Sequence, residues 1–274
     1  MTMGAFFALS IATAQGGYVS LSAGYAGGGN TVIGRDYVEI TEGKFDENFN
    51  WISGTDKRTN IIGSNGAGIP ISLAGGYMIS ENFGVELGFT YLMGSELTLG
   101  TSTKVSGYKN TTTSKGSQIR ILPQLVISTG SAMPVEIYAK TGLLVPVSGS
   151  TTINSETLDA AGFKSSVEYS TKGAFSLGYT GTLGVAYGIT DQLSVFGEMQ
   201  GVNLGIKGAS VTMTKNTYKD EDKLSDLKVN QKETVFVDEL TSEMNTKDSE
   251  PSSSLATISN YSSIGFNFGV KFNF

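Results

Sequence analysis

The side chains that most often carry out acid–base or metal chemistry are missing from this sequence. Its 274 residues include neither histidine nor cysteine. Without histidine the chain lacks the usual general base, proton shuttle and metal ligand, and without cysteine it forms no disulfide and no thiolate metal site. Ser150 and Asp159 are examples of residues with suitable chemistry, but they belong to no recognisable catalytic constellation. We predict that the protein is not an enzyme and has no cofactor.

Acidic residues gather near the C-terminal end of the chain. The segment 215–250 carries ten acids and six lysines, so it holds −4 of the total net charge of −6. Asp220, Glu221 and Asp222 suggest calcium, which several carboxylates can bind, but the DxDxDG spacing is absent. We therefore predict no metal site, and a solvated loop that the flanking strands partly extend. The negative net charge also argues against nucleic acid as a partner.

Six other charged residues stand in segments where apolar and polar residues alternate. In Asn82–Met93 (NFGVELGFTYLM) the odd positions are large and apolar, whereas Glu86 lies among the small or polar even positions. All six charges share this polar register, and they comprise three acids and three bases: Glu86, Arg120, Glu136, Lys140, Glu198 and Lys271. Because a lone buried charge loses its hydration without compensation, we predict that these six residues form a network of salt bridges.

Eight segments alternate in this way, and a period of two predicts β-strands. Three of the connections between them are short, at 80–82, 129–133 and 190–192, and four are long, at 27–68, 94–116, 148–172 and 205–263. Short and long connections interleave strictly. The predicted strands are Tyr18–Ala26, Ile69–Ile79, Asn82–Met93, Gln118–Ser128, Val135–Val147, Gly173–Ile189, Gln192–Leu204 and Ile264–Phe274.

Two architectures could use these strands. In a water-soluble sandwich the apolar faces would form the core and Glu86 would face solvent; in a membrane barrel they would face lipid and Glu86 would lie inside. The interleaved connections favour an all-β, eight-stranded antiparallel up-and-down transmembrane β-barrel with four long extracellular loops. The charge pattern agrees, because a Lys or Arg on the lipid face costs ~2–4 kcal/mol at mid-membrane. No apolar run reaches the ~18 residues that a spanning helix needs.

The interior of an eight-stranded barrel is just wide enough to be filled by side chains. The strand Gly173–Ile189 turns only Ala, Ser, Gly and Thr inward, which leaves room for the larger polar chains of other strands. We therefore predict a plugged lumen; the alternative is a water-filled channel lined by the same residues. Pro123 would face lipid and remove one ladder bond, so a bulge or kink is expected there.

Aromatic residues cluster near both ends of the predicted lipid face, where they suit interfacial girdles. Ligand stacking is the alternative role. The residues at the loop end are Tyr25, Tyr91, Phe175 and Tyr179, and those at the turn end are Tyr77, Phe83, Tyr187, Phe272 and Phe274.

The N-terminus has features of an export signal. Gly4–Ala14 resembles the apolar region of a signal peptide, and Ala12–Ala14 before Gln15 forms an A-x-A-like cleavage site. A positive n-region is missing, since the first basic residue is Arg35; the alternative is a frayed tail. We assign residues 1–14 to a signal-peptide remnant and residues 15–274 to the barrel domain.

Several motifs resemble those of the small outer-membrane β-barrel family, which includes the OmpA transmembrane domain, OmpX-like and opacity-type proteins. They are the turns ISEN before FGVELGFTY and ITDQ before LSVFGEM, and the C-terminus GFNFGVKFNF. The resemblance covers residues 16–274. It implies a bacterial outer-membrane location and an assembly signal at Phe268, Val270, Phe272 and Phe274, which the outer-membrane assembly machinery would read. ATAQ followed by Gly-Gly is similar to exported-protein ends of Bacteroidetes-type bacteria.

The long loops are where a specific activity is expected. The segment DYVEITEGKFDENFNWI could form a hairpin above the membrane or two further membrane strands, but its five acids argue against the second alternative. We predict a non-enzymatic barrel that acts through its loops, in surface interaction or adhesion or as an accessory subunit of a membrane complex. A narrow pore for small solutes is the alternative. The expected partners are outer-membrane lipid, the assembly machinery, and an extracellular or membrane-complex protein of unknown identity.

Overall fold

The computed structural model describes residues 16–29, 31–130, 134–241, 244 and 247–274. The predicted signal segment 1–14 lies outside the described residues. Eight antiparallel strands form a closed ring. Each pairs with the barrel strand that precedes it and the one that follows it in the sequence, and β1 pairs with β19 to close the ring. In ring order they are β1 (Gly16–Gly28), β6 (Gly68–Met78), β7 (Phe83–Gly94), β9 (Lys109–Ser128), β10 (Val135–Leu158), β12 (Gly178–Gly188), β13 (Leu193–Asn203) and β19 (Ser263–Asn273).

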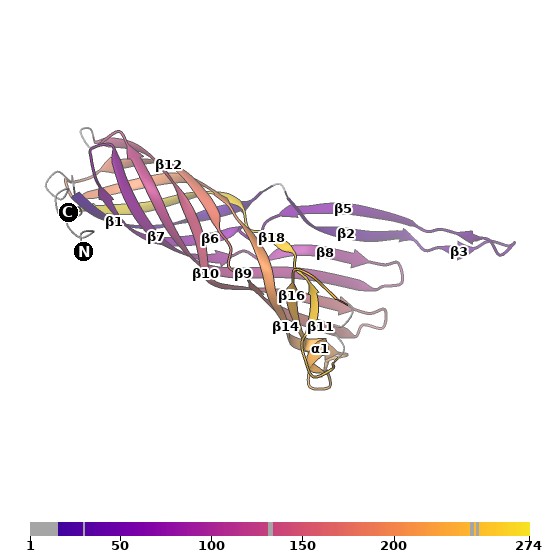
Figure 1. The fold of residues 1–274 in the computed structure, drawn as a ribbon. Helices are drawn as coiled ribbons and strands as arrows, with labels where there is room; N and C mark the ends of the chain where they lie inside the picture. The colour runs from indigo at the N-terminus through magenta and orange to yellow at the C-terminus, as the bar shows by residue number, and fades with distance from the viewer. Residues whose placement is uncertain (1–15, 30, 131–133, 242–243, 245–246) are drawn as a thin grey trace.

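The strands are strongly tilted within the wall, as Figure 1 shows. From Ser22 of β1, paired residues lead around the ring to Glu136 of β10 in one direction and to Pro146 of β10 in the other. The displacement from position 136 to position 146 is the stagger that a closed barrel requires, and it accompanies the tilt. Because the strands are tilted, side chains at the same distance along the barrel axis are not those that pair directly across neighbouring strands.

Alternation along each strand separates an exposed apolar wall from a buried interior. β7 alternates without a break, with Phe83, Val85 and Leu87 exposed and Glu86 only 5 % exposed. Along β12 the exposed side chains are large, and the inward positions are occupied by small residues such as Thr180, Thr182 and Ala186. Apolar side chains facing outward around a closed ring would be unfavourable in water, but acyl chains match them. The membrane-barrel orientation is confirmed.

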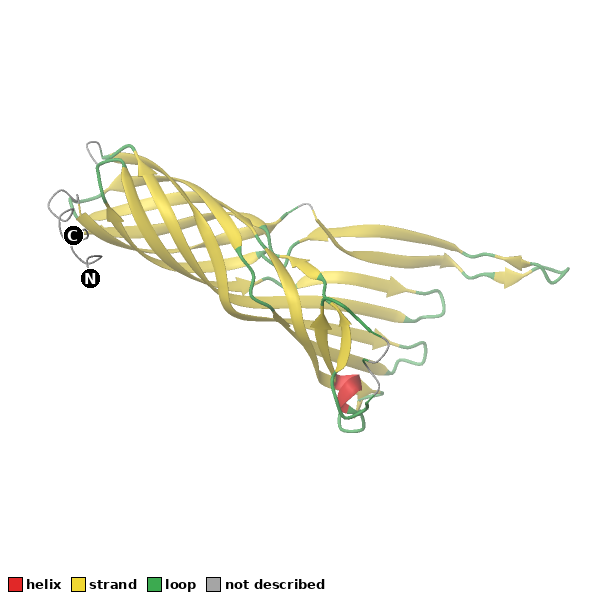
Figure 2. Cartoon of the chain, in the orientation of Figure 1, coloured by secondary structure: helices red, strands yellow, loops and turns green. Residues whose placement is uncertain are grey.

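Outside the barrel, the long connections are mostly strand rather than irregular loop (Figure 2). β9 and β10 continue past the wall as a two-stranded ribbon, and the hairpin of β2 (Thr31–Thr41) and β5 (Thr55–Gly63) projects furthest (Figure 1). The other large strands of this extracellular sheet are β8 (Leu97–Thr103), β11 (Lys164–Gly173) and β14 (Gly205–Tyr218). Backbone groups that leave the membrane still need hydrogen-bond partners, and continued pairing supplies them.

Short elements complete the extracellular sheet. The strand order of the extracellular sheet is β5–β2–β8–β9–β10–β11–β14–β16–β17. Two of its pairings are parallel, β2 with β8 and β16 with β17. No helix in the described part of the chain is long and apolar enough to cross a membrane. The short elements are β3 (Lys44–Phe45), β4 (Trp51–Ile52), β15 (Glu221–Asp222), α1 (Val229–Lys232), β16 (Glu233–Val237), β17 (Ser252–Leu255) and β18 (Ile258–Asn260).

Three details differ from the prediction or refine it. The predicted strand Gly173–Ile189 is divided, because β11 ends at Gly173 and β12 begins at Gly178. Pro123 faces outward and lies opposite Leu87 of β7 without a shift in register, but the pairing of β9 with β10 is interrupted beside it, between the pairs Gly142–Gln124 and Val145–Ile121. The register shift falls instead between Pro146 and Ser148, where a second proline also lacks an N–H donor. The segment DYVEITEGKFDENFNWI forms the extracellular hairpin and not two membrane strands.

Candidate functional site: the barrel lumen

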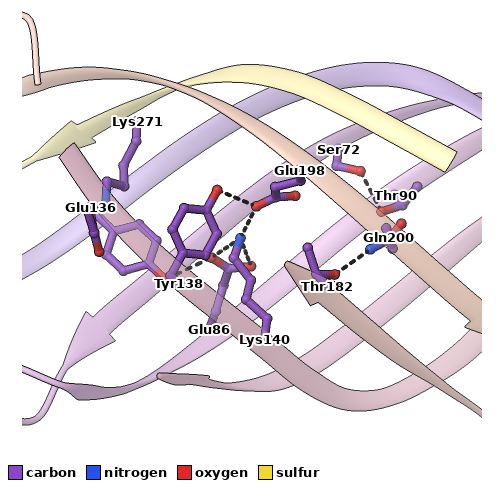
Figure 3. A network of polar contacts seen from close by, with 11 residues as sticks. Ser72, Glu86, Thr90, Glu136, Tyr138, Lys140, Thr182, Glu198, Gln200 and Lys271 are labelled. Carbon is purple, nitrogen blue, oxygen red and sulfur yellow. Dashed lines mark hydrogen bonds and ion pairs between the residues drawn. The ribbon is translucent and has the colours of Figure 1, made fainter. Parts of the chain in front are cut away.

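A buried ion-pair cluster lies in the turn-end half of the lumen (Figure 3). The ammonium of Lys140 on β10 lies 3.0 Å from Oε2 of Glu86 on β7 and 2.7 Å from Oε1 of Glu198 on β13. The Tyr18 hydroxyl donates to Glu86 at 2.8 Å, and the Tyr138 hydroxyl donates to Glu198 at 2.9 Å. One cation therefore serves two carboxylates, and each phenol donates to the same carboxylate oxygen that the Lys140 ammonium contacts. Additional hydrogen bonds of this kind are what a buried ion pair needs to offset desolvation.

A second ion pair lies nearer the turns. Lys271 of β19 pairs with Glu136 of β10, and the Ser128 hydroxyl donates to Glu136 at 2.7 Å. Both charged side chains are more exposed than those around Lys140. The Lys271 ammonium also lies 5.5 Å from the centre of the Tyr18 ring, so a cation–π contact joins this pair to the first cluster. Together the two groups contain three carboxylates and two lysines.

A cavity of about 640 Å³ separates these groups from the turn end of the barrel. Glu86, Glu136, Lys140 and Lys271 line it, together with residues of the short turns such as Glu81 and Asp191. The cavity extends from the short turns to Lys140, and its lining is mainly polar. A polar space of this size holds water, so the turn-end half of the lumen is a hydrated vestibule.

The loop-end half of the lumen is closed by an apolar cluster. Leu144 and Leu204 are 0 % and 1 % exposed, and they pack with Leu122, Val202, Ile206 and Tyr261. The Tyr261 hydroxyl shares a hydrogen bond of 2.6 Å with Thr151, and its backbone N–H donates to Leu204 at 2.8 Å. We call these six residues the apolar plug.

Extracellular backbone segments close over the apolar plug. The Ser64 side chain is completely buried and donates to the backbone carbonyl of Asn260 at 3.2 Å. The Asn65 side chain accepts from Ser114 at 3.1 Å. Residues that precede β6 and residues that precede β19 therefore meet across the mouth of the barrel.

The prediction that all six charges form one network is wrong for Arg120. Its side chain faces the lumen and is 3 % exposed, yet it forms no ion pair with any described residue. Its Nε donates to Gln118 at 2.9 Å, and its Nη2 has no hydrogen-bond partner. The physical reason is position: Arg120 lies opposite Thr90 and Pro146, toward the loop end, while every lumen carboxylate lies toward the turns.

Several lumen residues that matter were not singled out from the sequence. Tyr18 donates to Glu86, and Leu122 and Leu144 close the mouth. A signal was available for the two leucines, because Leu122 shares the inward register of Arg120 and Leu144 shares that of Lys140. Large residues on that register have to fill the lumen, whatever their polarity.

The predicted girdle and assembly residues lie on the outer wall. Phe175 lies between β11 and β12, and it is 81 % exposed. The remaining girdle residues are exposed: Tyr25, Tyr77, Phe83, Tyr91, Tyr179, Tyr187, Phe272 and Phe274. In the last strand, Phe268, Val270, Phe272 and Phe274 all face outward, and their reading by the assembly machinery stays a prediction.

A closed ring of tilted strands, apolar outside and ionised within, defines an integral outer-membrane β-barrel protein. Residues 2–231 match the family model described as the outer membrane protein beta-barrel domain. The chain belongs to this family, and its location is the bacterial outer membrane. Among curated proteins none matches the sequence.

Similar solved structures are also small outer-membrane proteins. Neisserial surface protein A (NspA) is 12 % identical, with a TM-score of 0.40, and the match covers 95 % of this chain and 99 % of that one. OprG from Pseudomonas aeruginosa is 12 % identical, with a TM-score of 0.45 and coverage of 96 % and 97 %. Ail of Yersinia pestis is 9 % identical, with a TM-score of 0.31 and coverage of 94 % and 99 %.

Proposed function

We propose that the protein is a non-enzymatic outer-membrane barrel that acts through its extracellular sheet, in surface interaction or adhesion or as an accessory subunit of a membrane complex. The observation that carries this proposal is the apolar plug. Leu144 and Leu204 are almost fully buried at the mouth, and the segments around Ser64 and Tyr261 cover it. A barrel with a dry, packed mouth is suited to presenting its outer strands rather than to passing solutes.

The extracellular sheet supports the same proposal. It extends well beyond the membrane wall, and several of its contacts make it an ordered platform. The backbone N–H and hydroxyl of Thr101 both donate to Asp36, at 2.9 and 2.8 Å, which ties the β2–β5 hairpin to β8. Asn110 donates to Ser155 and to Thr157 across the β9–β10 ribbon. An ordered surface binds a partner with less loss of conformational entropy than a mobile loop.

A narrow pore is the second candidate function, and the hydrated vestibule favours it. Planar-bilayer conductance of the refolded protein separates the two. We expect no discrete openings from the wild-type protein, whereas a Leu144→Gly/Leu204→Gly variant, with its plug thinned, should conduct and so prove that the assay detects an open barrel. Steady unitary openings of the wild-type protein would overturn the plugged proposal.

The role of the extracellular sheet has its own test. Replacing residues 36–58 by a short turn removes the projecting hairpin and leaves all eight barrel strands intact. Copurification from native membranes should recover a partner with the wild-type chain and lose it with the shortened chain. A partner retained equally by both, or bound through the turn end, would contradict action through this hairpin. Lipid and the assembly machinery remain expected partners of either chain.

A further inference from the structure

Arg120 is the one lumen charge without an opposite charge among the described residues. Its side chain is 3 % exposed, and its hydrogen bond to a described residue is the one from Nε to Gln118. A guanidinium carries five N–H donors. A buried charge without a partner costs several kcal/mol of free energy, so a folded protein is expected to provide a counter-charge.

The side chains around Arg120 do not provide that counter-charge. Thr90 lies opposite it on β7 and already shares a hydrogen bond with Ser72 at 2.7 Å, and Pro146 lies opposite it on β10. Tyr261, from the segment before β19, packs in the apolar plug, and its hydroxyl shares a hydrogen bond with Thr151. None of these groups is anionic.

The buried lumen atoms that lack a hydrogen-bond partner near Arg120 are all donors. Within the described part of the chain, two buried lumen atoms lack a hydrogen-bond partner, namely Nη2 of Arg120 and Nε2 of Gln124, and both are donors. Both side chains project from the lumen face of β9. A neutral amide can be satisfied by water, but a buried guanidinium keeps its charge when water binds it. The missing partner of Arg120 is therefore an acceptor that carries negative charge.

The carboxylates in the turn-end half of the lumen do not serve as the counter-charge of Arg120, because they already bind other groups. Glu86 and Glu198 both bind Lys140, and each accepts from a tyrosine. Glu136 is bound by Lys271 and Ser128. The turn-end half of the lumen thus contains three glutamates and two lysines, a net charge of −1. Arg120 carries the positive charge that balances it, but it lies on the other side of Leu122. The charges balance over the whole lumen but not locally.

We propose that Arg120 holds a small inorganic anion of halide size inside the barrel, bound through Nη2. The size follows from packing, because Arg120 is almost fully buried and does not line the 640 Å³ vestibule. An anion there would be enclosed between the vestibule and the apolar plug. It would serve as a structural counter-ion that neutralises the loop-end half of the lumen.

The first test is crystallographic. The full chain is refolded in bromide, since an enclosed ion exchanges best while the barrel is forming, and anomalous diffraction is recorded. We expect a bromide peak within hydrogen-bonding distance of Nη2 of Arg120. Ordered water alone at that position, or a protein carboxylate in contact with Nη2, would overturn the proposal. This test uses the wild-type protein, so it is independent of how any variant folds.

The second test is thermal unfolding in detergent, with protein refolded in sodium chloride or in sodium gluconate at equal ionic strength. A ligand that binds only the folded state raises its stability, and we expect the midpoint in chloride to be higher by about 2–4 °C. Arg120→Met should lose this difference and, lacking a buried unpaired charge, should be at least as stable in both salts as the wild type is in gluconate. Lys271→Met is the matched control, because it removes a lumen cation elsewhere and should keep the chloride response.

These outcomes decide the proposal in either direction. A chloride response that persists in Arg120→Met would place the ion elsewhere and overturn it. An identical midpoint in both salts for the wild type, with no bromide peak, would also overturn it. The result does not depend on the function proposed above, because either a plugged or a conducting barrel could hold this ion.

Discussion

In the turn-end half of the lumen, three carboxylates and two lysines lie beside the hydrated vestibule, and every one of them has a partner. In the loop-end half, Leu144, Leu204 and Tyr261 pack into a dry plug, and Arg120 lies beside it with no ion pair to any residue that the structure describes. The same barrel strands supply most of the side chains of both halves from the same inward register, although Tyr261 comes from the segment before β19. Alternation therefore decides which side chains turn inward, but it does not decide whether they meet water, a charge or one another.

The difference has a consequence for energetics. Ion pairs near water are partly screened, whereas ion pairs enclosed by protein depend on each partner being present. The plug instead gains its stability from packing, which is sensitive to lost volume. Substitutions in the turn-end half should therefore lower the free energy of unfolding by leaving a charge unpaired, and substitutions in the loop-end half should lower it by leaving a cavity.

The largest effect is expected at Lys140, which serves two carboxylates. Lys140→Met leaves Glu86 and Glu198 close together and without a cation, and we expect a loss of about 3–5 kcal/mol in the free energy of unfolding. Urea unfolding in micelles measures it. Adding Glu86→Gln and Glu198→Gln should restore most of the loss, because the amide oxygens still accept from Tyr18 and Tyr138. Additive losses in the triple variant would show that the three residues are not coupled.

The next largest effect is expected in the apolar plug. Leu144→Ala should cost about 2–5 kcal/mol, since it removes a completely buried side chain and leaves a cavity. The neighbouring Leu143 faces the membrane and is 48 % exposed. Leu143→Ala is the matched control, and lipid can fill the space it leaves, so a much smaller loss is expected. Equal losses at the two positions would mean that the plug is not tightly packed.

A smaller effect is expected from the hydrogen bond within the plug. Tyr261→Phe removes the hydroxyl that bonds Thr151 and should cost about 1–2 kcal/mol, because the buried Thr151 hydroxyl loses its partner. Tyr25→Phe is the control on the outer wall, where the tyrosine is 61 % exposed. Chemical unfolding should show almost no change for Tyr25→Phe, and a comparable loss at both positions would contradict this role for Thr151.

The smallest effect is expected at Lys271, which lines the vestibule. Lys271→Met should cost about 1 kcal/mol or less, because water in the vestibule can hydrate the Glu136 carboxylate that loses its partner. The comparison with Lys140→Met is the sharpest contrast available, since both variants remove one lumen lysine. If the two cost the same amount under the same conditions, the vestibule does not screen charge.

Much of the fold was accessible from sequence, for reasons that particular residues illustrate. Phe83, Val85 and Leu87 alternate with Glu86 because the two faces of a membrane strand meet media of opposite polarity. The order of short and long connections then determined the up-and-down topology. Extracellular structure was less accessible: the segments at 94–116 and 148–172 were expected to be loops, but they continue the sheet as β8, β9, β10 and β11. Their Thr- and Ser-rich sequences have no continuous face of large apolar residues, so they lack the alternation that reveals a strand.

The lumen was accessible only in part. Sequence placed Glu86, Lys140 and Glu198 on the inward register, but the pairing of one lysine with two glutamates depends on the stagger of the closed ring. The same stagger carries Arg120 away from the carboxylates and toward the plug. Sequence by itself thus determined the orientation of every barrel strand, because the membrane acts on each residue separately. Only the tertiary structure decided which inward residues meet, because that depends on the height at which each strand enters the ring.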